Sequence, residues 1–137
     1  MIRAVLDTNI VVSALLQPLG PSAQVLVMVL DGSILLCVSG SIYAEYEEVV
    51  GRPHFKLSRD VITAALDAIR KKGLWVRPTE SIRSCSDPDD DVFLECAQAA
   101  QADYLVTGNV KHFPASWGGT RVVTARWLVD NYSPETS

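Results

Sequence analysis

The sequence predicts an α/β domain of three layers, α/β/α, with a mostly parallel central sheet of about five strands. Two observations lead to this fold class. Short apolar runs without polar alternation, typical of strands buried on both faces, recur along the chain. Segments with helical periodicity separate these runs, so each connection is expected to be a right-handed crossover that covers the sheet.

The first strand–helix unit lies at the N-terminus. We expect a buried strand at residues 3–6 and a helix at 8–16 that ends before Gln17-Pro18. The segment Gly20-Pro21-Ser22 breaks the periodicity and caps a second helix at 23–30.

The second unit begins with an expected buried strand at 34–38. Ser39-Gly40-Ser41 then supplies the caps for a helix at 42–50. After a break, Ser58 caps a long amphipathic helix at 59–72.

The C-terminal half repeats the alternation. A short strand is expected at 74–76, and Asp87-Pro88 opens the next helix after a polar loop. Strands at 104–106 and 121–123 follow, and a helix at 124–131 closes the fold.

Length and composition fit one compact domain. The chain has 137 residues, 48% of them hydrophobic, and we assign 1–132 to a single domain and 133–137 to a flexible tail. Its three cysteines form no Cys-x-x-Cys pair, which argues against a disulfide framework and a zinc site. No run approaches the roughly 20 apolar residues that span a bilayer, so we expect a cytoplasmic protein without a membrane partner. The net charge of -4 means that a nucleic-acid partner would require metal ions or a local basic patch.

Acidic and amide side chains recur where the expected strands end. Asp7 follows the first strand, Glu45 lies about one turn into the helix after the second, and Asn109 follows the fourth. Right-handed crossovers place these strand ends at one edge of the sheet, where ligands collect. The acidic run 87–91 joins them if the preceding loop returns to that edge. Asp103, at the start of its strand, should face the opposite edge.

Helical spacing selects within each acidic cluster. Glu45 lies nearest the apolar stripe of its helix, whereas Glu47 and Glu48 point farther away. Asp90 heads an i, i+3, i+4, i+7 series of apolar residues, and Asp91 heads a more polar series. We therefore choose Glu45 and Asp90 as inward-facing residues, with Asp91 as the second choice.

Each of these residues also has a simpler interpretation. Asp and Asn at strand-to-helix turns are usually helix caps, Asp87 before Pro88 most of all, and single glutamates are usually solvated. Three converging carboxylates favour a site, because they repel one another unless a cation lies between them. A divalent ion such as Mg²⁺ suits oxygen ligands and can activate water against a phosphate. The set therefore predicts phosphodiester hydrolysis.

Ordered motifs along nearly the whole chain resemble those of PIN domains, particularly the small VapC-like toxins of type II toxin–antitoxin modules. The matching segments are Val5-Leu6-Asp7-Thr8-Asn9, Ala44-Glu45-Tyr46, Asp87-Pro88-Asp89-Asp90 and Leu105-Val106-Thr107-Gly108-Asn109. The resemblance implies a PIN-like fold and an Mg²⁺- or Mn²⁺-dependent ribonuclease. It also implies an RNA substrate, a cognate antitoxin that blocks the acidic cleft, and a homodimer.

The resemblance implies a role for individual residues. Asp7, Glu45 and Asp90 correspond to the acidic residues that hold the metal, and Asn109 takes the fourth catalytic position. Asp often fills that position in the family, so Asn109 departs from the pattern and argues against a second ion. Thr107 and Asn9 correspond to polar groups that surround the metal ligands.

Basic residues follow the helix that carries Glu45. They could hold RNA phosphates, which position a strand without reading it, or complement the helix dipole. These residues are Arg52, His54, Lys56 and Arg59. Arg70-Lys71-Lys72 has the same ambiguity at the end of its helix, and His112 is either a substrate contact or a surface residue near a turn.

Two other functions remain open. A non-catalytic PIN-like module that binds RNA or a partner protein is favoured by Asn109 and by the acidic net charge. An aspartyl-phosphate enzyme or phospho-receiver built around Asp7 is weaker. The phosphatase pattern usually places a second Asp two residues on, where this chain has Asn9.

Overall fold

The computed structural model describes residues 1–132 and contains a six-stranded sheet with strand order β3-β2-β1-β4-β6-β5. The strands are β1 (Ile2–Leu6), β2 (Ile34–Val38), β3 (Leu74–Trp75), β4 (Tyr104–Val106), β5 (Ser116–Trp117) and β6 (Thr120–Val123). Neighbouring strands are parallel except β5 and β6. The α/β class and the mostly parallel sheet are thus confirmed. The expected tail at 133–137 lies outside the described residues.

Strand β5 is the one that the sequence pattern did not reveal. It pairs antiparallel with β6 through a tight turn at Gly118-Gly119, and Gly118 has φ of 57°. Glycine adopts this left-handed conformation without the steric cost of a Cβ atom. A strand of two residues is too short to show a hydrophobic period, so only its turn residues mark it in the sequence.

Six α-helices and three short 3-10 turns complete the described fold. The helices are α1 (Thr8–Leu16), α2 (Pro21–Leu30), α3 (Gly40–Val50), α4 (Arg59–Lys72), α5 (Asp91–Ala100) and α6 (Ala125–Asn131). The 3-10 turns are η1 (Pro53–Phe55), η2 (Pro88–Asp90) and η3 (Val110–His112). All the expected helices are therefore present.

Four helix starts differ from the sequence-based expectation, among them that of α6, which begins at Ala125 because Thr124 is its N-cap. Helix α2 begins at Pro21, because proline fits the first helical position and Gly20 acts as its N-cap. Helix α3 begins at Gly40, one residue after Ser39, whose hydroxyl accepts a hydrogen bond from a helix amide at 3.3 Å. The helix expected after Asp87 starts as η2 and becomes α5 only later.

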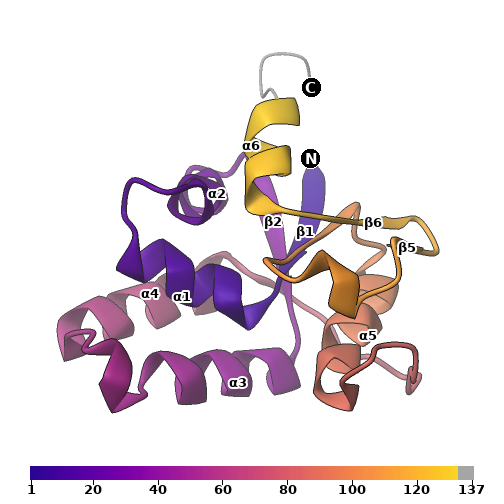
Figure 1. Ribbon diagram of the computed structural model, residues 1–137, viewed down its shortest axis with the longest axis horizontal. Coiled ribbons are helices and arrows are strands. Elements are labelled where there is room, and N and C mark those ends of the chain that lie inside the picture. The colour runs from indigo at the N-terminus through magenta and orange to yellow at the C-terminus, as the bar shows by residue number, and fades with distance from the viewer. Residues whose placement is uncertain (133–137) are drawn as a thin grey trace.

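The helices cover both faces of the sheet. Helix α5 packs on β1, β2 and β4, whereas α2 packs on β2 and contacts α6. In Figure 1, α2 lies to the left of β1 and β2, and α5 lies to their lower right. The crossovers from β1 to β2 and from β3 to β4 run in opposite directions across the sheet, so right-handed connections place their helices on opposite faces. The three-layer prediction is confirmed.

The carboxyl end of β1 is fixed from two directions. Leu6 lies opposite Val106 of the neighbouring strand β4, and both side chains are fully buried. From the other side, the buried Tyr46 of α3 donates a hydrogen bond from its hydroxyl to the Leu6 carbonyl. This contact attaches α3 to the end of β1 and so brings the residue before Tyr46, Glu45, to the same edge of the sheet.

No single helix in the part of the chain that the structure describes is long and apolar enough to cross a membrane. Helices α1 and α2 together meet the length and composition criteria, but they are bent by 102° at the break between them. Residues of both, including Ile10, Val11 and Val25, are buried in the domain core.

Candidate active site

Asp7 stands where β1 passes into α1, and its carboxylate is turned toward β4. The residue is only 7% exposed, and its Oδ2 accepts a hydrogen bond from Thr107 Oγ1 at 2.7 Å. Its side chain makes no capping hydrogen bond to α1, although Asp7 occupies the N-cap position. Burial raises the pKa of Asp7, and the Thr107 hydroxyl offsets part of this rise. The Thr8 and Asn9 amides also lower the pKa of Asp7, so the carboxylate interacts with the start of α1 as well as with Thr107.

Glu45 reaches the same edge from α3. It is half-buried and accepts a hydrogen bond from the hydroxyl of Thr8, the first residue of α1. Burial raises the pKa of Glu45, and the charges of Asp7 and Asp89 raise it further. The side chain predicted from helical spacing to face inward is thus directed to the end of β1. The contribution of Thr8 was not foreseen, because a Thr at a helix start has many possible partners.

Asp90 completes the group from the end of η2. Burial raises the pKa of Asp90 to about 6, with further contributions from the charges of Asp7 and Asp87. The Nδ1 atom of His112 lies 3.8 Å from Asp90 Oδ2. The structure thus places His112, which the sequence left as either a substrate contact or a surface residue, beside an acidic candidate.

Asp91 has a different environment from its neighbour. It is buried, and its Oδ1 accepts hydrogen bonds from the amides of Ser84 at 3.1 Å and Cys85 at 2.8 Å. Burial acts to raise the pKa of Asp91, but these amides outweigh it and leave the pKa below its ordinary value. The carboxylate holds the loop before η2, so the structure favours Asp90 and gives no support to Asp91 as the alternative metal ligand.

Asp7, Glu45 and Asp90 line one pocket of about 500 Å³. Asp87 and Asp89 line it too, and Asp87 also accepts a hydrogen bond from the Asp89 amide at 2.9 Å, as expected of a cap. Apolar side chains form another part of its wall: Val12, Leu16, Val49 and Phe55. We call this the acidic pocket. The sequence did not indicate that α1 and η1 supply its apolar wall.

The acidic pocket suits a divalent cation by the chemistry of its donors. Five carboxylates face it and no cationic side chain lines it, so an ion with oxygen ligands would relieve their repulsion. Within residues 1–132, however, no three His, Cys, Asp or Glu side chains are already arranged to bind one ion together. Glu45 is held by Thr8 instead. The residues therefore fit such an ion in kind, and their side chains must move to coordinate it.

The polar residues around Asp7 form a short chain of hydrogen bonds. Thr107 Oγ1 donates to Asp7 and accepts from the Asn109 amide at 3.0 Å, while Asn9 Oδ1 accepts from the Gly108 amide at 3.3 Å. Asn109 is exposed and is not among the residues that line the acidic pocket. The structure thus brings Thr107 and Asn9 to the end of β1, whereas Asn109 joins through its backbone.

The basic residues after α3 border the acidic pocket without entering it. Arg52 pairs with Glu48 at 2.8 Å, and the ring of His54 packs on Phe55 with centroids 4.1 Å apart. Lys56 and Arg59 are exposed. Farther along, Arg70 and Lys71 pair with Asp67. Two residues that line the pocket connect this patch to it: Phe55, which packs on His54, and Val49, whose carbonyl accepts a hydrogen bond from the Arg52 amide at 3.1 Å.

Asp103 confirms the assignment of the sheet edges. It immediately precedes β4, and its carboxylate accepts a hydrogen bond from the Arg3 amide at 2.9 Å, near the start of β1. The three cysteines are free, with Cys37 and Cys96 buried and Cys85 partly exposed.

Comparisons with known proteins agree with this architecture. A family model described as PIN domain matches residues 3–111, a span that contains every acidic candidate. The uncharacterized protein MJ1680 of Methanocaldococcus jannaschii is 27% identical over 111 residues, which cover 79% of this chain and 71% of that protein. A chain in the crystal structure of VapBC2 from Rickettsia felis, bound to a DNA fragment from their promoter, has a similar fold. The TM-score is 0.59 at 17% identity, with 90% of this chain and 98% of that chain covered.

Proposed function

The chain belongs to the PIN domain family, and on this premise we propose that it is a metal-dependent endoribonuclease. One observation carries the proposal: Asp7, Glu45 and Asp90 line one pocket, burial raises the pKa of each, and repulsion by neighbouring carboxylates adds to the rise at Glu45 and Asp90. Titratable groups with such shifts in a pocket are candidates for function. Repulsion of this kind disfavours the empty pocket and favours a bound cation.

The residues of the pocket have separate roles in this proposal. Asp7, Glu45 and Asp90 hold Mg²⁺ or Mn²⁺, and Thr107 fixes the orientation of the Asp7 carboxylate through its hydrogen bond. When bound, the ion supplies an activated water and stabilises charge on the scissile phosphate. Asn9 holds the Gly108 amide and so keeps the loop after β4 against the start of α1.

The negative charge of RNA is repelled by the carboxylates of the acidic pocket. The bound ion offsets part of this repulsion, and the exposed Arg52, His54, Lys56 and Arg59 offer phosphate contacts at the border formed by Phe55. Because Arg52 already pairs with Glu48, His54, Lys56 and Arg59 are the freer members of this patch.

We further propose that the protein is the toxin of a toxin–antitoxin pair. The similar fold in VapBC2, which is a complex of two components on DNA, and the resemblance of the motifs support a cognate antitoxin that covers the acidic pocket. A homodimer is part of the same proposal. Its best supported surface is the apolar groove between α1, α2 and α4, where Leu30 and Val61 are 41% and 42% exposed.

The nuclease is tested by incubation of purified protein with single-stranded RNA in Mg²⁺ or Mn²⁺, with and without a chelator. We expect endonucleolytic products that chelation abolishes. Glu45→Gln should lose activity and Glu47→Gln should keep it, because Glu47 lies on the same helix but is exposed and outside the pocket. If Glu45→Gln cleaves as well as the parent after contaminating nuclease is excluded, the proposed site is wrong. Intact RNA with no stabilisation of the protein by either ion would favour a non-catalytic module.

A further inference from the structure

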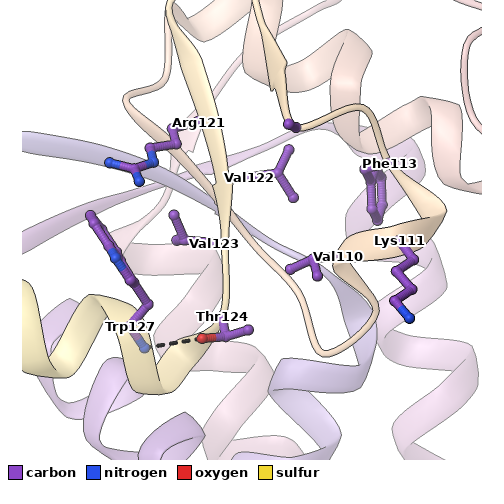
Figure 2. Close-up of a pocket in the computed structure, with 9 residues that line it drawn as sticks. Val110, Lys111, Phe113, Arg121, Val122, Val123, Thr124 and Trp127 are labelled. Atoms are coloured by element: carbon purple, nitrogen blue, oxygen red, sulfur yellow. Dashed lines mark hydrogen bonds between the residues drawn. The ribbon is translucent and has the colours of Figure 1, made fainter.

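A second pocket lies on the other side of η3 from the acidic pocket. It measures about 370 Å³, within the range of small-ligand sites, and Figure 2 shows the side chains around it. Trp127 and Arg121 stand on one side, Lys111 and Phe113 on the other, and Val110 and Val123 lie between them. Most of its wall is therefore apolar or aromatic.

The charge of this second pocket is opposite to that of the acidic pocket. Lys111 and Arg121 line it, no carboxylate does, and neither cation forms an ion pair with any residue among 1–132. The Arg121 guanidinium carbon lies 4.6 Å from the centre of the Trp127 ring, a cation–π contact that holds the guanidinium beside the pocket. An occupant should therefore combine a flat apolar part with negative charge.

The 3-10 turn η3 connects the two pockets. Val110 and Lys111 line the second pocket, and the next residue, His112, lies 3.8 Å from Asp90 of the acidic pocket. Adjacent Cα atoms are about 3.8 Å apart, so a ligand that reaches both pockets crosses only one short turn of backbone. A polymer with bases and phosphates in alternation can occupy the two sites together.

We propose that the second pocket is a nucleobase subsite for single-stranded RNA, with Lys111 and Arg121 contacting the phosphates on either side of the bound base. This inference deepens the proposed ribonuclease and rests on it. The apolar and aromatic side chains exclude water from the face of the base, and the guanidinium of Arg121 offers a planar surface for stacking. The subsite directs the strand toward the acidic pocket, because Lys111 precedes His112, which lies 3.8 Å from Asp90.

Binding rather than cleavage tests the subsite. Fluorescence anisotropy of a labelled single-stranded RNA is measured with Ca²⁺ in place of Mg²⁺, with gels to verify that the RNA stays intact. Lys111→Gln and Arg121→Gln should each weaken binding and make the slope of log K against log salt shallower by about 0.7. Arg126→Gln is the matched control, because Arg126 is exposed next to Trp127 but does not line the pocket. It should leave the slope unchanged.

The apolar wall is tested without any change of charge. Val110→Ala should weaken RNA binding about four-fold for each methyl group that no longer contacts the base. The slope of log K against log salt should stay unchanged. We place a single abasic nucleotide at each position of the RNA in turn. The affinity should fall roughly 5- to 150-fold when the missing base is the one that occupies the subsite. At that position Val110→Ala should have no further effect, because the base that it contacts is absent. Val27→Ala, an exposed valine of α2, is the control for the substitution itself.

The outcomes separate the subsite from the nuclease. If the parent cleaves RNA but Lys111→Gln, Arg121→Gln and Val110→Ala all bind RNA like the parent, the subsite is wrong and the nuclease stands. Weaker RNA binding by these variants in a protein that fails to cleave supports the subsite and overturns the nuclease. If the same variants lose affinity for a polyglutamate peptide and keep their affinity for RNA, the pocket takes an acidic polypeptide instead. Thermal melts of each variant verify that it is folded.

Discussion

At the amino edge of the sheet, the Asp103 carboxylate is exposed and accepts a hydrogen bond from the Arg3 amide at 2.9 Å. At the carboxyl edge, Asp7 is only 7% exposed and lines a pocket with four further carboxylates. The two edges also differ in their buried threonines. Thr120 donates to the Ala102 carbonyl at 2.6 Å, whereas Thr107 donates to the Asp7 carboxylate.

This difference separates a carboxylate with a structural role from a carboxylate of the candidate active site. Burial of charge opposes folding, so carboxylates whose pKa values are raised by burial are candidates for binding or reaction. The amino edge avoids that cost, because Asp103 is exposed to solvent and accepts a hydrogen bond from the Arg3 amide. At the carboxyl edge, burial raises the pKa of several carboxylates, among them Asp7 and Asp90. Substitutions at the two edges should therefore have different consequences.

The largest expected effect is the loss of cleavage at the carboxyl edge alone. Asp7→Asn and Asp90→Asn should each lower the rate of RNA cleavage by more than the roughly 10- to 100-fold that partners of metal ligands typically contribute. Asp103→Asn should keep the parental rate, because its side-chain carbonyl can still accept the Arg3 amide. Equal rates for all three variants in a gel-based assay would remove the functional distinction between the edges.

The next largest effect is a difference between substitutions of the two buried threonines, Thr107 and Thr120. Thr107→Val should lower cleavage or metal affinity by about 10- to 100-fold, because the Asp7 carboxylate loses the hydroxyl that orients it. Thr120→Val removes a buried hydroxyl at the opposite edge and should affect only the free energy of unfolding, by about 1–3 kcal/mol. Titration calorimetry with Mn²⁺ and urea unfolding measure the two effects. A Thr107→Val protein that loses stability but retains full metal affinity would assign Thr107 to the fold alone.

A smaller effect concerns stability without metal. Asp90→Asn should raise the free energy of unfolding of chelator-treated protein at pH 7.5 by about 1–2 kcal/mol, because it removes a charge that burial and Asp7 disfavour. Asp103→Asn should give no such gain. Addition of Mn²⁺ should stabilise the parent more than Asp90→Asn, since a ligand stabilises the state that binds it. Urea titrations with and without the ion measure both differences.

The smallest expected effect is a pH dependence of the free energy of unfolding, which also arises from Asp90. The pKa of Asp90 is about 6 in the folded protein against 3.8 for the ordinary carboxyl, so the folded state binds more protons between these values. The metal-free parent should therefore lose stability as pH rises from about 4 to about 6, with about 1 kcal/mol between pH 5 and pH 7 from this group. Other groups titrate as well, so the quantity to compare is the difference between the parent and Asp90→Asn. An identical slope in both proteins would exclude Asp90 as its origin.

Much of the fold is encoded in local patterns. The buried strands at 34–38 and 104–106 have the predicted bounds, because each apolar run ends at a polar residue, Ser39 or Thr107. Helix starts moved by a residue or two, since Gly20 and Ser39 act as N-caps earlier than periodicity suggested. Strand β5 has only two residues and depends on β6 for its pairing, so no hydrophobic period could have predicted it.

The site was predictable where topology determined it. Parallel strands fix the edge at which Asp7 and Glu45 meet, and helical spacing distinguishes Glu45 from its neighbours. Asp90 and Asp91 were harder to separate, because the loop at Ser84 and Cys85 donates to Asp91 through backbone amides that have no sequence signature. The second pocket was missed for a similar reason: η3, β6 and α6 form it only when they pack together.

The hydrogen bond between Thr107 and Asp7 spans 100 residues of sequence. During synthesis, a ribosome that has reached the end of α4 at Lys72 has already incorporated Asp7 and Glu45, but Asp90, Thr107 and strand β4 do not yet exist. At this stage β1 lacks one of its two neighbours, and the chain lacks part of the acidic pocket. If the protein cleaves RNA, the growing chain cannot attack the transcript being read until Asp90 and β4 have been added.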